Sequence, residues 1–177
     1  HVLRRRQRQM CIRDRLKGSL LVMAGGNPEL FERQKPILQT LSAEPRLMGP
    51  VGSGMASKLA LNQLIASLTH GFSLALRLVQ AQGVAVEEFM EVLRPSAVYA
   101  PTYDKKLERM LDQHYANPNF STALLRKDLG LFLQASEQAG LEASGLQGIL
   151  ELLQRASDQP IDPLDYCSLH ELTGPKR

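Results

Sequence analysis

One stretch of the sequence joins a glycine-rich turn to a long apolar run: GPVGSGMASKLALNQLIASLTHGFSLALRLVQAQG, residues 49–83. From residue 53 onward the apolar side chains fall on nearly every side of a helical wheel, which is typical of a central helix that other elements surround. We expect this helix to end at Gly83, because glycine is common just after a helix C-terminus. At 1.5 Å per residue it would be roughly 45 Å long. Such a helix needs neighbours on every side, and these would include a second subunit.

The residues before this stretch predict a small β-α-β unit. Residues 18–26, GSLLVMAGG, form a short apolar run closed by two glycines, a pattern typical of a buried strand and a turn. Pro28 begins a predicted helix over residues 28–42, and residues 46–48 form a second short strand. One such unit cannot bury its own faces, so residues 16–50 are interpreted as the last unit of a larger sheet domain.

The residues after the turn are predicted to be helical throughout. The expected helices are separated by prolines and by Gly140, and they cover residues 86–94, 102–113, 121–139, 144–157 and 165–172. The expected fold class is therefore mostly α. An all-helical domain over residues 51–177 follows the β-α-β piece.

Composition excludes several classes of protein. Of the 177 residues, 44% are hydrophobic and 22% are charged, which excludes an intrinsically disordered chain. Two cysteines, Cys11 and Cys167, are too few for a disulfide framework or a zinc ligand set. We therefore expect no metal site, and a reduced thiol at Cys167 in a cytoplasmic protein. His70 and Arg77 within the apolar run argue against a membrane span.

The positive charge of the chain is concentrated at its N-terminus. Residues 1–15, HVLRRRQRQMCIRDR, contribute +5 to a net charge of +3, so the rest of the chain carries −2. A basic arm can bind nucleic acid, but this one has neither interleaved aromatic residues nor an amphipathic period. We interpret it as a sequencing adapter translated in frame, disordered or irregular. We expect no nucleic-acid or membrane partner, and we expect the chain to be a fragment of a longer protein.

The glycine-rich turn matches neither of two common phosphate-binding loops. A P-loop needs a lysine directly after its last glycine, where this chain has Met55. A dinucleotide fingerprint needs a third glycine, where this chain has Ser57, and an acidic residue about 20 positions later, where it has LALRL. A plain helix start, with Ser53 or Gly54 near the N-cap, accounts for the glycines equally well.

Two pairs of polar side chains interrupt apolar helical segments. Lys58 and Asn62 are four residues apart, so they share one helix face and can hold a carbonyl or carboxylate oxygen between them. A partly buried lysine there would suit general acid–base work. The other interpretation is a lysine that reaches into solvent and an amide that caps a loop. Lys127 and Asp128 form the second pair, which on these residues alone is better explained as a surface ion pair.

Three ordered motifs resemble those of the β-hydroxyacid dehydrogenase family, the NAD(P)-dependent oxidoreductases like 3-hydroxyisobutyrate dehydrogenase. GPVGSGMASKLALN is similar to the family's G-x-x-G-x-G-x-x-x-K-x-x-x-N motif, with Lys58 and Asn62 at the matching positions. FSTALLRKDL is similar to its F-x-x-x-x-x-x-K-D-L motif, with Phe120, Lys127 and Asp128 matching. DYCSLHEL, near the C-terminus, is similar to the family's closing helix.

The resemblance implies a fold and an activity. The fold is a helical substrate and dimerisation domain like the C-terminal domain of 6-phosphogluconate dehydrogenase, preceded by a remnant of an NAD(P)-binding Rossmann domain. The activity is reversible interconversion of a short β-hydroxy acid and its semialdehyde or keto form. Lys58 would be the proton donor or acceptor, held in place with the substrate by Asn62. The substrate carboxylate would lie beside Gly52, Ser53 and Gly54. The cofactor would contact Phe120, Lys127 and Asp128.

The resemblance also limits what this chain can do. The dinucleotide fingerprint is absent from the sequence, so the chain as given is expected neither to bind NAD(P) well nor to catalyse the reaction. The family's helical domain commonly pairs with another subunit, which implies a homodimer or homotetramer. The substrate and the choice between NAD and NADP stay open. The alternative hypothesis is a non-catalytic helical dimerisation or binding module.

Overall fold

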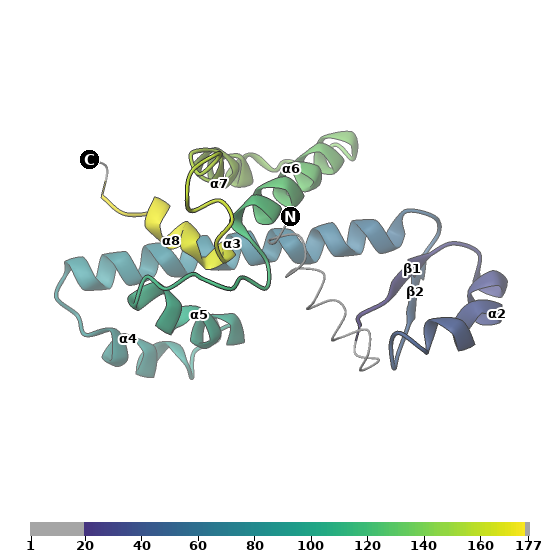
Figure 1. The fold of residues 1–177 in the computed structure, drawn as a ribbon, viewed down its shortest axis with the longest axis horizontal. Helices are drawn as coiled ribbons and strands as arrows, with labels where there is room; N and C mark the ends of the chain where they lie inside the picture. The colour runs from purple at the N-terminus through teal and green to yellow at the C-terminus, as the bar shows by residue number, and fades with distance from the viewer. Residues whose placement is uncertain (1–19, 176–177) are drawn as a thin grey trace.

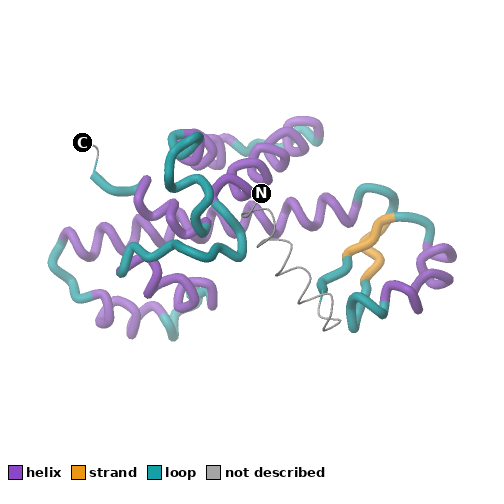
Figure 2. The backbone as a smooth tube through the Cα atoms, in the orientation of Figure 1, coloured by secondary structure: helices purple, strands orange, loops and turns teal. Residues whose placement is uncertain are grey.

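The computed structural model describes residues 20–175, so the interpretation of residues 1–15 lies outside the described part of the chain. One long helix forms the axis of the molecule (Figure 1). A small β-α-β unit lies at one end of this helix, and the other helices gather around the rest of it (Figure 2). The described residues are mostly helical, as the sequence predicts.

The β-α-β unit is smaller than its sequence pattern suggests. Strands β1 (Met23–Gly25) and β2 (Arg46–Gly49) pair in parallel, with helix α2 (Pro28–Leu38) between them. Within the described residues, the strand predicted in the run 18–26 covers only three residues, because β1 forms a ladder only along the short partner strand. Its residues are half-buried or exposed, so the expectation of a buried strand is not met by the described part of the chain. The predicted helix over 28–42 ends at residue 38, where the chain turns back so that β2 can lie beside β1.

Helix α3 (Ser53–Ala81) begins against the end of β1, and its bounds confirm the long helix predicted over residues 53–83. Gly54 has no room for a side chain, because a Cβ there would lie 2.3 Å from the carbonyl oxygen of Met23. The N-cap is Gly52, one position before the residues expected from the sequence. Its φ of +98° lies in the left-handed region, which glycine adopts without steric cost.

Within the described residues, α3 is buried on one face only. The buried face supplies Ala66, Phe72 and Leu76 to the core. The opposite face carries what we call the α3 stripe, which consists of Leu61, Leu64, Gly71 and Leu78. Leu64 is 48% exposed and Leu78 is 64% exposed, so the expectation of neighbours on every side is not met by the described part of this chain.

Helix α3, with 29 residues, is also long and apolar enough to cross a membrane, since one stretch of 18 residues within it has a mean hydropathy of 1.3. The central helix of a soluble protein passes the same test. One charged group of α3 has a protein partner, since the Arg77 guanidinium donates a hydrogen bond to the main-chain carbonyl of His170 at 3.0 Å. The apolar character of α3 is therefore no evidence for a membrane.

The remaining helices pack on two sides of α3, with α4 and α5 on one side and α6 and α7 on the other (Figure 1). They match the predicted helices within three residues at each end, except that the last predicted helix is divided in two. Their bounds are α4 Val86–Leu93, α5 Pro101–Leu111, α6 Thr122–Gln138, α7 Ser144–Gln154, the 3-10 turn η1 Tyr166–Ser168 and α8 Leu169–Leu172. The largest fully buried apolar side chains of the core are Leu76, Met90, Met110, Leu125, Leu129, Leu153 and Leu169.

Candidate functional site

The two motifs singled out from the sequence meet where α6 packs on α3. The Asn62 Nδ2 group donates a hydrogen bond to Asp128 Oδ2 at 2.6 Å. Asp128 is buried, with 8% of its surface exposed. Because an ionised carboxylate only accepts hydrogen bonds, this contact fixes the orientation of the amide. The nitrogen of Asn62 must face Asp128, and its Oδ1 atom is left for another partner.

The two lysines of these motifs lie outside this buried contact. Lys127 Nζ is 3.5 Å from Asp128 Oδ1, and its side chain is 64% exposed. Lys58 is exposed on α3, one turn before Asn62. The partial burial expected for Lys58 is therefore not provided by the part of the chain that the structure describes. The carboxylate of Asp128 and the ammonium groups of Lys58 and Lys127 together give this region a net positive charge.

Glycines lie at the ends of the two strands, beside the start of α3. Because they carry no side chain, the main chain is accessible there. The Gly26 N–H donates to the Gly49 carbonyl at 2.8 Å, which holds the carboxyl ends of β1 and β2 together. A Cβ on Gly26 or Gly52 would meet nothing within 4 Å. Ligands of parallel sheets bind at such carboxyl ends, and a helix N-terminus favours anions. This edge of the molecule therefore suits a carboxylate or phosphate.

The residues predicted to bind the substrate carboxylate have different environments. Gly52 is exposed, Ser53 is half-buried and Gly54 is buried against β1. The Ser53 carbonyl accepts a hydrogen bond from the Ser57 hydroxyl at 2.9 Å. Gly52 and Ser53 are therefore the accessible members of this group, and Gly54 allows the close approach of α3 to the sheet.

Phe120, predicted to contact the cofactor, packs on the core. Its ring is half-buried, with its centroid 6.0 Å from that of Tyr166. Its main-chain carbonyl accepts a hydrogen bond from the Tyr166 N–H at 2.9 Å. The structure thus gives Phe120 a packing role, and its contact with a cofactor stays a prediction.

Asp165 is a buried charged residue that the sequence analysis did not single out. It is 0% exposed, and its two carboxylate oxygens accept hydrogen bonds from Lys106 Nζ at 2.9 and 3.0 Å. Its Oδ1 atom also caps η1 by accepting from the Cys167 N–H at 3.2 Å. Asp165 is the first residue of the helix predicted over 165–172, and aspartate is a preferred N-cap residue, so its cap role could have been identified from the sequence.

Asp165 and its neighbours hold the first turn of α6. Ser121, the N-cap of α6, pairs with Asp165 in an antiparallel bridge. The hydroxyls of Thr122 and Ser168 are hydrogen bonded at 2.8 Å. Asp128 follows Thr122 by less than two helical turns, so these contacts help to set where its carboxylate lies. Cys167, expected to be a reduced thiol, is free and fully buried, and burial raises the pKa of its thiol.

Comparisons with known sequences agree on one family. The family model described as "NAD-binding of NADP-dependent 3-hydroxyisobutyrate dehydrogenase" matches residues 52–172. The chain is 30% identical over 154 residues to 2-hydroxy-3-oxopropionate reductase of Escherichia coli K12, a match that covers 86% of this chain and 52% of that protein. It is 28% identical over 164 residues to 3-hydroxyisobutyrate dehydrogenase of Pseudomonas aeruginosa, covering 88% and 55%. The chain spans about half the length of the curated relatives it matches.

Solved structures show the same fold. The 3-hydroxyisobutyrate dehydrogenase of Mycobacterium tuberculosis, solved with L-serine, superposes with a TM-score of 0.80 at 22% identity, covering 92% of this chain and 58% of that one. A 3-hydroxyisobutyrate dehydrogenase from Salmonella typhimurium superposes with a TM-score of 0.76 at 19% identity, covering 90% and 56%.

Proposed function

This chain belongs to the NAD-binding 3-hydroxyisobutyrate dehydrogenase-like family, and on that premise we propose that it is the C-terminal part of an NAD(P)-dependent oxidoreductase. The parent protein interconverts a short β-hydroxy acid and its semialdehyde or keto form, with Lys58 as the proton donor or acceptor. One observation carries this proposal. The 2.6 Å hydrogen bond between Asn62 and Asp128 joins two separate family motifs into one site.

The small size of the sheet supports the proposed domain assignment. Two short parallel strands cannot form an independent sheet domain, and the curated relatives are nearly twice as long as the matched segment. Residues 16–50 are then the last β-α-β unit of a Rossmann domain. The helices after residue 50 form a substrate and dimerisation domain like the C-terminal domain of 6-phosphogluconate dehydrogenase.

The residues present fit one end of a dinucleotide cofactor. The exposed Lys127 ammonium beside buried Asp128, together with the open strand ends, provides positive charge and accessible main chain for an anionic ligand. Lys127 would hold the cofactor near its nicotinamide, with contributions from Asp128 and Phe120. Bound NAD(P) supplies or accepts a hydride. The pyrophosphate would be held by the Gly-rich loop of the first βα turn, which this sequence lacks.

The residues of this chain perform the proton transfer and hold the substrate. During reduction the substrate carbonyl oxygen gains negative charge, which a nearby ammonium group stabilises before donating its proton. Lys58 supplies this group. The Oδ1 atom of Asn62 faces away from Asp128, so it is available to accept a hydrogen bond from Lys58. The positive end of α3, at Gly52 and Ser53, favours the substrate carboxylate.

Substitution of Lys58 tests the catalytic assignment. In the parent protein that carries the upstream half, Lys58→Ala should lower kcat by about 10²- to 10⁴-fold, the usual contribution of a general acid. The melting temperature should be unchanged, because Lys58 is exposed. The assay follows oxidation of NADH and NADPH with a panel of three- and four-carbon semialdehydes. Lys105→Ala, at another exposed lysine, is the matched control, and near-normal turnover by Lys58→Ala would contradict the assignment.

The α3 stripe supports a homodimer or homotetramer, since a row of exposed leucines on a helix is typical of a subunit contact. The protein is proposed to be cytoplasmic. The same stripe favours the alternative function, a helical dimerisation module without catalysis. The two functions differ in one result, because the module would form oligomers but show no NAD(P)-dependent turnover with the upstream half present.

A further inference from the structure

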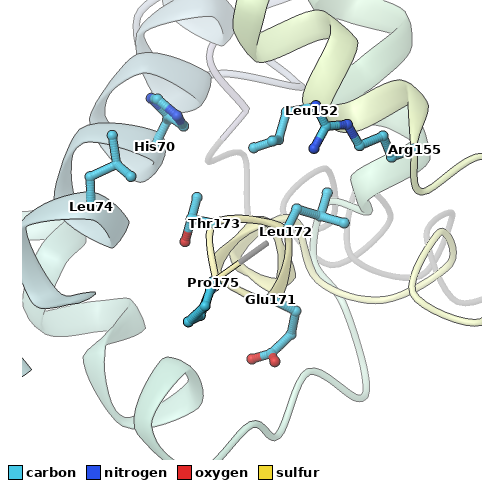
Figure 3. A pocket seen from close by; sticks show the side chains of 9 residues that line it. His70, Leu74, Leu152, Arg155, Glu171, Leu172, Thr173 and Pro175 are labelled. Carbon is cyan, nitrogen blue, oxygen red and sulfur yellow. The ribbon is translucent and has the colours of Figure 1, made fainter. Parts of the chain in front are cut away.

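A pocket of about 310 Å³ lies on the flank of α3, away from the proposed catalytic site. His70 at its edge follows Lys58 by twelve residues, which is roughly 18 Å along the helix. The pocket is open to solvent on one side, and residues of α3, α7, α8 and the segments that follow α7 and α8 line it (Figure 3). The apolar part of its wall consists of Leu74, Leu152, Leu172 and Pro175.

One cation lies at the rim of the pocket without a counterion. Arg155 is exposed, and its guanidinium forms no ion pair or hydrogen bond with the residues that the structure describes. Figure 3 shows Arg155 and His70 on either side of Leu152. Burial lowers the pKa of His70 below its ordinary value of 6.5, so its imidazole is neutral at pH 7 and donates one N–H.

The charge beneath the pocket is also positive. The Arg77 guanidinium donates to the His170 carbonyl at 3.0 Å and lies 3.9 Å from where a Cβ on Gly174 would be. Glu171 is the acidic residue that lines the pocket. Its Oε1 atom accepts a hydrogen bond from the Tyr115 hydroxyl at 2.6 Å, and Figure 3 shows its carboxylate turned away from Arg155. Arg155 is therefore the lining residue that can pair with an anion.

We propose that this pocket binds a small aliphatic carboxylate, with its hydrocarbon chain against Leu74, Leu152 and Leu172 and its carboxylate on Arg155. A guanidinium group matches the two oxygens of a carboxylate with parallel hydrogen bonds. The aliphatic walls gain from contact with methylene groups that would otherwise be in water. Inorganic phosphate could pair with Arg155, but it would leave these walls exposed.

The test is an NMR titration of the full ¹⁵N-labelled chain with hexanoate at pH 7. We expect saturable shifts at the Thr173 and Gly174 amides, and binding at least tenfold weaker in Arg155→Gln. Hexanol, which has the same chain without the charge, should also bind at least tenfold more weakly than hexanoate. Arg33→Gln is the matched control, because Arg33 is exposed on α2 and forms no ion pair within the described residues.

Several results would overturn this proposal. The first is hexanoate binding that Arg155→Gln leaves unchanged. The second is a ligand other than a carboxylate that binds at least as well, with hexanol as tight as hexanoate or inorganic phosphate tighter than hexanoate. The third is chemical-shift changes confined to Lys58 and Asn62. Leu74→Trp provides a second variant, since it fills the pocket and keeps the charge. It should abolish the shifts at Thr173 and Gly174, and retained binding would also overturn the proposal. None of these readouts depends on catalytic activity.

Discussion

Asn62 and Asp128 form a polar contact within an otherwise apolar packing of two helices. A buried carboxylate costs free energy unless it accepts hydrogen bonds, and Asp128 meets this need with the Asn62 amide at 2.6 Å. A slide of α6 along α3 by one turn, about 5.4 Å, would break the contact. These two residues therefore select one packing arrangement of α3 and α6 from several that apolar contacts alone would allow.

His170 gives the stability of the protein a pH dependence. It is 3% exposed, and burial, followed by the charge of Arg77, lowers its pKa to about 4. In the unfolded chain this pKa returns to about 6.5. Between these two values the unfolded state binds more protons, so the free energy of unfolding falls as the pH falls. The contribution of His170 is complete above pH 6.5, and the loss by pH 4 should reach about 3 kcal/mol.

Urea unfolding between pH 7 and pH 4 measures this contribution of His170. His170→Asn should flatten the pH dependence relative to the unsubstituted protein, because it removes the titrating group. His114→Asn should leave the pH dependence unchanged, since His114 is exposed. If His170→Asn and the unsubstituted protein lost stability in parallel over this range, the assignment to His170 would be wrong.

At the scale of elements, the first turn of α3 determines how the helix meets the sheet. The main chain at Gly54 lies directly against β1, with 2.3 Å between the Met23 carbonyl oxygen and the position of a Cβ on Gly54. A carbonyl group in a strand cannot rotate away as a flexible side chain can. The helix therefore reaches the carboxyl ends of the strands only because residue 54 is glycine.

Gly54→Ala should consequently destabilise the protein by about 1–3 kcal/mol, the usual cost of overpacking. Gly148→Ala is the matched control, because Gly148 lies inside α7 and a Cβ there would meet nothing within 4 Å. This control should raise stability by about 0.5–1 kcal/mol. Urea unfolding measures both variants, and equal effects would show that the close contact of α3 with β1 is absent.

At the scale of the whole molecule, the α3 stripe is the main apolar surface of the long helix that the described chain leaves uncovered. Leu64 belongs to this stripe and is 48% exposed. Leu64→Glu should convert the proposed oligomer to monomers, because burying an unpaired carboxylate in a subunit contact is costly. Light scattering after size-exclusion chromatography measures the mass.

Gln80→Glu is the control for this substitution, since residue 80 is exposed about 160° around the helix from Leu64. The Gln80→Glu variant should keep the mass of the unsubstituted protein. A monomeric unsubstituted protein, or an oligomer that survives Leu64→Glu, would show that the α3 stripe is not the subunit contact.

Local patterns in the sequence were sufficient to predict the helices and the β-α-β unit. Apolar periodicity, glycines and prolines act within a few residues, so the bounds of α3 and of the later helices follow from them. Lys58 and Asn62 share a helix face for the same reason. The short β1 was less predictable, because strand length depends on the partner strand.

Contacts between segments far apart in the sequence could not be predicted from local patterns, because they depend on how the helices pack. Asn62 and Asp128 are 66 residues apart, and Lys106 and Asp165 are 59 apart. Nothing in either local pattern specifies such a partner. The exposure of Lys58, the packing of Phe120 on Tyr166 and the pocket beside Arg155 likewise depend on where several helices meet. Their physical origin is the requirement that apolar faces be covered and buried charges be paired at the same time, which only the assembled chain can satisfy.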